Sequence, residues 1–206
     1  MTDKYTVRDF LVYFITGLFL LLTLLYRFGI SFLEFFRITQ TDIKDNSALT
    51  VFLLIPLLYI LGHIVHAIDM LLLKSGQYIW KIKEKDSLKL KKLKIFWIFI
   101  FFNFIISGNR VTGILNEKRQ NRGTFWKRVH ELRHENKSSN SEYWYLMSDL
   151  HKGLALICIA WTILYLCEYD KINTIISATL AFLFWIRAGH MAKNFVSTIN
   201  NTNELE

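Results

Sequence analysis

The chain has 206 residues, of which 52% are apolar and 16% aromatic, and its formal net charge at neutral pH is +8. Two cysteines and one proline exclude a disulfide framework, a cysteine-rich zinc site and long proline-rich linkers. The apolar residues are clustered in blocks, which favours a multi-span membrane protein over a soluble domain.

The first apolar block, residues 10–26, follows Lys4 and Arg8 in the way that the apolar part of a signal peptide would. No small-residue cleavage site follows it, so we interpret this block as a retained signal anchor. The next residues read FGISFLEFF and can extend the first helix along the outer surface.

The second block, residues 49–73, is longer than the roughly 20 residues that cross a bilayer core. It carries His63, His66 and Asp69 at helical spacings i, i+3 and i+6, so these side chains cover an arc of about 120° on one flank. Entering from outside near Leu49, His66 and Asp69 lie roughly 25 and 30 Å deep, at the cytoplasmic side of the hydrocarbon.

Residues 74–153 form a basic insert with 17 Lys and Arg residues against 7 Asp and Glu residues. Its first part reads KIKEKDSLKLKKLK and is typical of juxtamembrane segments that are attracted to anionic headgroups. The following Phe-rich block, residues 95–106, is only about 18 Å long as a helix and is interrupted by Asn103. We expect it to lie in the interface rather than to cross, with a fifth span as the alternative.

The later part of the insert predicts an amphipathic helix with Thr124 as a fair N-cap. Phe125, Val129 and Leu132 recur at i, i+4 and i+7, which suggests a helix lying on the membrane or on a partner. The expected partner-binding or lipid-binding residues of the whole insert are Lys89, Lys91, Lys92, Lys94, Arg122, Trp126, Lys127, Arg128 and Arg133.

Blocks 154–167 and 172–186 are separated by a tight turn, so they are predicted to form an antiparallel helical hairpin. If five blocks crossed, the Lys and Arg residues would divide almost evenly between the two sides of the membrane. If residues 95–106 do not cross, 21 of the 25 lie on one side and 4 on the other. The positive-inside rule therefore predicts four spans, with both termini in the cytoplasm.

The predicted fold is an all-α integral membrane bundle of four transmembrane helices with a basic helical cytoplasmic insert. Its parts are the first two spans with their external loop (1–73), the insert (74–153), and the hairpin with the cytoplasmic tail (154–206). Lone strands are excluded from the spans because they leave backbone groups unpaired in lipid.

The last two spans are too short without their polar flanks, so they draw further ionisable residues toward the inner leaflet. Because charges that face lipid are costly, these groups should face inward and pair, with Asp69 bonded to Arg187 or Lys152. The predicted intramembrane cluster is His63, His66, Asp69, Asp149, His151, Lys152, Arg187 and His190.

Three interpretations of this cluster stay open: hydrogen-bonding contacts between helices, a cavity that conducts ions or senses the membrane state, and a metal site. No phosphate-binding loop, Ser/His/Asp array or pair of catalytic carboxylates can be assembled, so an enzyme is the weaker class. A metal-dependent membrane hydrolase or lipid-modifying enzyme would need several of the histidines to converge. A nucleic-acid-binding anchor would act through the aromatic and basic insert. We expect no cofactor.

Three features together carry a resemblance: the segment IPLLYILGHIVHAIDMLLLK, the basic insert, and WIRAGHMAKNF near the end. This pattern resembles small membrane proteins of bacterial anti-phage loci, such as the Kiwa membrane subunit and the transmembrane accessory proteins of type VI CRISPR loci. The resemblance implies a homo-oligomer of the inner membrane that detects or answers infection, with a soluble effector at its cytoplasmic face.

Overall fold

The computed structural model describes residues 3–42, 47–81, 115, 118–135 and 139–202, among which there is no strand. The chain divides into two compact units, Met1–Ala67 and Ile68–Glu206. The predicted interfacial block, residues 95–106, lies outside the described residues. The long helix α3, Ser47–Lys81, contributes its first part to one unit and the remainder to the other.

Four of the helices are long and apolar enough to cross a membrane, which confirms the predicted all-α, four-span class. They are uninterrupted because their interiors consist of Leu, Ile, Phe and Ala with few charges, and a helix satisfies every backbone group internally. The candidate spans are Phe10–Arg27 in α1 (Asp3–Arg27), Ala48–Leu71 in α3, Asn140–Cys167 in α7 (Ser139–Cys167) and Lys171–Asn201 in α8 (Lys171–Asn201).

In the first unit, α1 ends in a sharp turn rather than continuing into the next segment. Gly29 has a φ of +68°, and the Ile30 N–H donates to the Leu25 carbonyl at 3.0 Å, which caps the last turn of α1. A separate helix, α2 (Phe32–Asp42), then begins, so the expected extension of the first helix is wrong. The cause is the left-handed backbone at Gly29, a conformation that no continuing helix contains.

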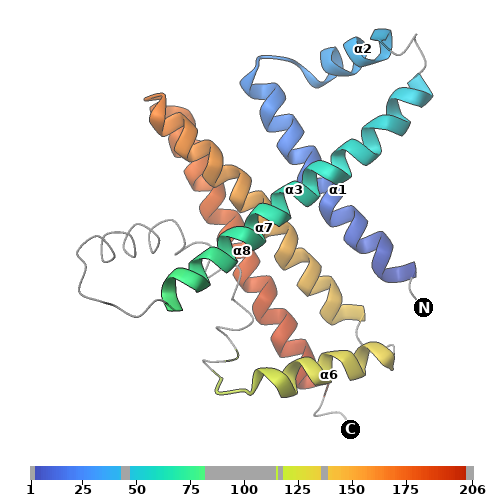
Figure 1. The fold of residues 1–206 in the computed structure, drawn as a ribbon, viewed down its shortest axis with the longest axis vertical. Helices are drawn as coiled ribbons and strands as arrows, with labels where there is room; N and C mark the ends of the chain where they lie inside the picture. The colour runs from blue at the N-terminus through green and yellow to red at the C-terminus, as the bar shows by residue number, and fades with distance from the viewer. Residues whose placement is uncertain (1–2, 43–46, 82–114, 116–117, 136–138, 203–206) are drawn as a thin grey trace. The chain divides into compact units, whose positions relative to one another are not determined.

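Helices α1 and α3 cross at two glycines (Figure 1). A Cβ built on Gly17 would fall onto the backbone carbonyl of Leu58, and one built on Gly62 onto that of Tyr13. Each helix therefore places a glycine against the backbone of the other. Small residues at such a crossing let two spanning helices approach closely in lipid, where apolar burial by itself gives little reason to associate.

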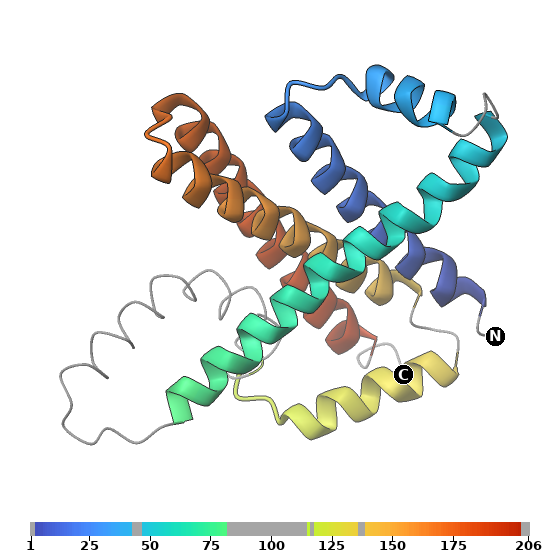
Figure 2. The same cartoon turned by 45° about the horizontal axis from the view of Figure 1, so that its top comes forward.

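In the second unit, α7 and α8 form the predicted antiparallel hairpin and lie side by side in both views (Figure 1, Figure 2). Two hydroxyl contacts join them: Thr162 Oγ1 donates to Ser177 Oγ at 3.1 Å, and Ser148 Oγ donates to the Ala188 carbonyl at 2.9 Å. Interhelical hydrogen bonds of this kind stabilise membrane helix pairs by about 0.6 kcal/mol each on average.

The hairpin turn contains Tyr169 in the left-handed region, with a φ of +60°, and this residue is 90% exposed. The Asp170 N–H donates to the Tyr165 carbonyl at 3.0 Å, as in the capped end of α1, where the equivalent position is a glycine. Replacing Tyr169 with glycine is expected to stabilise the hairpin by about 1 kcal/mol, because glycine adopts this backbone without steric cost. Thermal unfolding in detergent should show a higher Tm; an unchanged or lower Tm would contradict this account of the turn.

Helix α6 (Arg122–His134) lies across the last turns of α8 (Figure 1). Its N-cap is Asn121, whose side chain accepts a hydrogen bond from the Gly123 N–H at 2.9 Å, so the prediction of Thr124 is wrong by one turn. The predicted apolar face is real, but it is buried against α8 rather than on lipid or a partner. The buried cluster contains Leu115, Phe125, Val129, Leu132, Ala192, Phe195, Val196 and Ile199.

Candidate functional site

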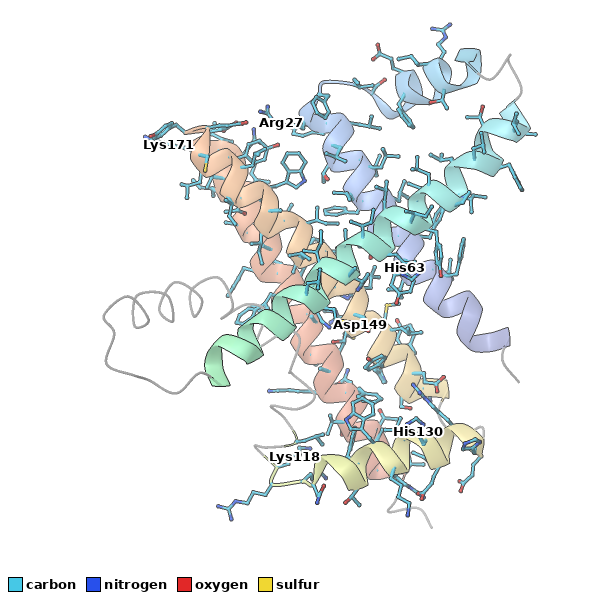
Figure 3. All side chains as sticks on the ribbon, in the orientation of Figure 1. Arg27, His63, Lys118, His130, Asp149 and Lys171 are labelled. Atoms are coloured by element: carbon cyan, nitrogen blue, oxygen red, sulfur yellow. The ribbon has the colours of Figure 1, made fainter. Side chains whose placement is uncertain are left out.

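A buried cluster of two acids and one base joins α3 to α7 within the second unit. Lys152 Nζ lies 2.9 Å from Asp149 Oδ1 and 3.5 Å from Asp69 Oδ2. The side chains of Asp69, Lys152 and Asp149 are only 9%, 14% and 28% exposed. We call these three residues the acid–base triad; Figure 3 labels Asp149 on α7.

The local sequence explains how the triad is assembled. Asp149 and Lys152 are three positions apart on α7, which places their side chains on the same face of the helix. Asp69 reaches Lys152 from α3, near the end of an apolar candidate span. Of the two predicted partners of Asp69, the structure therefore brings it to Lys152.

The triad holds two carboxylates and one ammonium, so its fully ionised form carries one excess negative charge. In a low-dielectric environment an unbalanced charge is costly, and the cost is removed when the site takes up a proton or a monovalent cation. The arrangement can therefore exist in two charge states, and the change between them acts on the ion pair that joins α3 to α7.

The two histidines of the predicted stripe lie in the first unit, beside aromatic rings of α1 and α3. The His63 ring stacks on Tyr13 with centroids 3.8 Å apart, and Tyr59 meets it edge-on at 4.4 Å. His66 meets Tyr13 edge-on at 5.0 Å. Figure 3 shows His63 where α3 crosses α1. These rings fill the space around the glycine crossing.

Thr16 fixes how His66 bonds to α1. Thr16 Oγ1 donates its proton to the Val12 carbonyl at 2.8 Å, and it lies 3.5 Å from His66 Nε2. Because the hydroxyl proton is already used, Thr16 Oγ1 is available as an acceptor for an N–H of the His66 ring.

The remaining predicted cluster residues are on α7 and α8 but do not join the triad. His151 Nδ1 donates to the Met147 carbonyl of its own helix at 2.6 Å, and its ring lies 6.2 Å from that of Phe184. Arg187 and His190 are exposed on α8. Arg187 is close enough to His151 to act on it electrostatically, but among the described residues no ion pair joins Arg187 to the triad.

On α6 the predicted basic residues have different environments. Arg133 pairs with the buried Glu142 of α7 at 3.2 Å, and Arg128 lies 3.7 Å from Glu131. Lys127 is exposed, whereas Trp126 packs against the apolar cluster that joins α6 to α8. Arg122 begins the helix, and Lys89, Lys91, Lys92 and Lys94 lie outside the described residues.

A cavity of about 240 Å³ lies between the start of α6 and the end of α8. Gln120 Nε2 donates to Asn200 Oδ1 at 3.1 Å, while Gln120 Oε1 is buried and makes no hydrogen bond. The lining residues are Gln120, Asn121, Thr124, Phe125, Arg128, Ile199 and Asn200.

Sequence reasoning missed the side chains that surround the histidines and the acid that holds α6. Tyr13, Thr16 and Gly17 recur at i, i+3 and i+4 on the first span, a pattern that identifies a contact face but not the helix that it contacts. Glu142 lies in the first turn of α7, where a carboxylate is common because it interacts favourably with the helix dipole. Its position therefore gave no sign that it pairs with α6.

Among the residues that the structure describes, no group of three or more His, Cys, Asp or Glu side chains is placed to hold a metal ion. No protein-family model matches the chain, and comparisons with curated proteins and with solved structures also find no match. The interpretation of function therefore rests on the geometry of the four candidate spans and of the triad.

Proposed function

We propose that this chain is a non-enzymatic, homo-oligomeric protein of the bacterial inner membrane that senses the state of the membrane or changes its permeability. In this proposal both termini and α6 face the cytoplasm, where a soluble effector docks, and the system acts in defence against phage. The observation that carries the proposal is the acid–base triad inside two candidate spans.

Ionisable groups within spanning helices are expensive, and those that remain commonly mark ion or proton pathways or sensing elements. The triad fits this class because its charges do not balance: uptake of one proton or one monovalent cation neutralises the site. Lys152 is the only cation in it, and Asp69 and Asp149 compete for that ammonium. A change of occupancy therefore weakens or strengthens the link between α3 and α7.

The cytoplasmic docking role is supported by the way α6 is held. Its apolar side is used against α8, and the Arg133–Glu142 pair joins it to α7. Movement of α7 is therefore transmitted to α6, whose outward residues include Lys127, His130 and His134. An acidic surface on a soluble effector is complementary to this face.

Ion flux in proteoliposomes tests the proposal. We expect the purified chain to release a proton or monovalent-cation gradient, and we expect Asp69→Asn to lower the rate at least tenfold, because the altered triad has balanced charges and no longer needs a cation. Glu34→Gln changes the same kind of side chain at an exposed position on α2 and should leave the rate unchanged. Equal flux through the parent and Asp69→Asn would refute the proposed role of the triad.

The defence role has a separate readout. Bacteria that express the chain together with its flanking genes should form fewer phage plaques, and Asp69→Asn should abolish this protection while Glu34→Gln retains it. Plaque numbers unchanged by the parent genes under a panel of phages would refute the defence role and leave the flux result standing.

A further inference from the structure

Within the first unit, α3 carries a regular stripe of exposed residues. Its members are spaced alternately four and three positions apart, which is the 3.5-residue repeat that keeps one face of a helix against a parallel neighbour. Every member is exposed. The stripe consists of Leu49, Leu53, Pro56, Ile60, His63 and Ala67.

Most exposed residues on a spanning helix need no partner, because lipid covers Leu, Ile and Phe without cost. His63 is different. It is exposed inside a candidate span, and its contacts with Tyr13 and Tyr59 are made through aromatic rings. An imidazole N–H or ring nitrogen that faces hydrocarbon without a hydrogen bond costs several kcal/mol.

We infer that this stripe is the interface between two copies of the chain, which pack α3 against α3 in parallel with His63 facing His63. The inference rests on the proposed membrane placement, which gives both copies the same orientation. A symmetric parallel pair brings each residue of the stripe opposite its own counterpart. Neutral imidazole has one donor and one acceptor, so one His63 can donate its N–H to the bare ring nitrogen of the other across the axis.

Three further features of the stripe fit a second copy better than lipid. Ala67 is small and lets the helices approach closely one turn after His63. Pro56 has no N–H to donate, so the Phe52 carbonyl lacks its helical hydrogen bond, and this polar group is costly next to lipid. A single polar residue in an otherwise apolar seam fixes the register of the pair, because any shifted pairing leaves it unsatisfied.

The stacked tyrosine prepares His63 for this contact. With its ring held 3.8 Å from Tyr13 at an interplanar angle of 19°, the imidazole has little rotational freedom left to lose when a second copy binds. The glycine crossing that brings Tyr13 so close to α3 therefore also orients the polar member of the proposed interface.

Single-cysteine cross-linking in native membranes tests the inference. In a background carrying Cys158→Ala and Cys167→Ala, Ile60→Cys and Ala67→Cys should give at least five times more oxidative dimer than Ile55→Cys. Ile55 is a matched control, since it is exposed on the same helix but lies off the stripe. A disulfide forms only when the two Cα atoms come within about 7 Å. Equal cross-linking at all three positions, or none, would overturn the proposed interface.

Substitution of His63 separates a polar interface from a merely apolar one. His63→Leu should lower the dimer fraction about threefold, the effect of one interhelical hydrogen bond in a membrane, whereas His63→Asn should retain it. An undiminished dimer fraction in His63→Leu would refute the role of the imidazole. Because neither readout depends on ion flux, loss of flux in Asp69→Asn without cross-linking along the stripe would refute this interface and leave the proposed function in place.

Discussion

Replacing Lys152 with methionine is expected to lower the free energy of unfolding by about 3 kcal/mol, the lower end of what removal of one partner costs in a buried ion pair. The change removes the ammonium that lies 2.9 Å from Asp149 and 3.5 Å from Asp69, and it leaves two carboxylates close together among apolar helices. Methionine keeps much of the length and apolar stem of lysine, so the cost is electrostatic. Thermal unfolding in detergent measures it.

A second substitution tests this explanation. In Lys152→Met/Asp69→Asn the repulsion between carboxylates is gone, so most of the lost stability should return and the two changes should be strongly non-additive. Lys193→Met, on the exposed side of α8, is the control and should change stability by less than about 0.5 kcal/mol. Additive effects of the two triad substitutions would show that the ion pair does not hold α3 to α7.

Replacing Gly62 with alanine is expected to cost about 2 kcal/mol, although the change adds only one methyl group. The added Cβ would meet the backbone of Tyr13, and a backbone carbonyl cannot rotate away as a flexible side chain can. The two helices must therefore separate, which also breaks the contact of Tyr13 with His63. A fall in Tm of roughly 5 °C is the expected measurement.

Gly123→Ala is the matched control for this effect. At Gly123 the nearest atom to an added Cβ is Asn121 Oδ1 at 3.4 Å, which is an ordinary contact with the end of a side chain. Alanine is also the better helix former, so this variant should be as stable as the parent or slightly more stable. A Gly62→Ala protein with the parental Tm would show that the crossing is looser than described.

The spans could be predicted from sequence because the cost of placing polar backbone in lipid makes long apolar runs helical almost regardless of context. The pairing of Asp69 with Lys152 was also within reach, since depth along two helices limits which charges can meet. The rotation of each helix about its own axis could not be predicted in this way. Arg187 and His190 were predicted to join the cluster but are exposed on α8, because the direction in which a side chain points from its helix depends on packing that a single sequence does not reveal.

The amphipathic helix near residue 125 shows the same limit in another form. The spacing of Phe125, Val129 and Leu132 predicts that one face of this helix is buried. It does not predict whether lipid, a partner protein or the chain's own α8 buries that face, because all three are apolar. The cover is provided by Phe195, Val196 and Ile199, which follow the last apolar block and were assigned to the cytoplasmic tail.

The burial of α6 against α8 also sets an order of events during synthesis. The ribosome completes Phe125 about 70 residues before Phe195, and at roughly 5–20 residues per second several seconds separate the two. Throughout that interval the apolar face of α6 has no native packing partner, and it gains one only after α8 has been synthesised. A nascent chain that stalls before Phe195 therefore exposes the apolar face of α6, the kind of surface that chaperones bind.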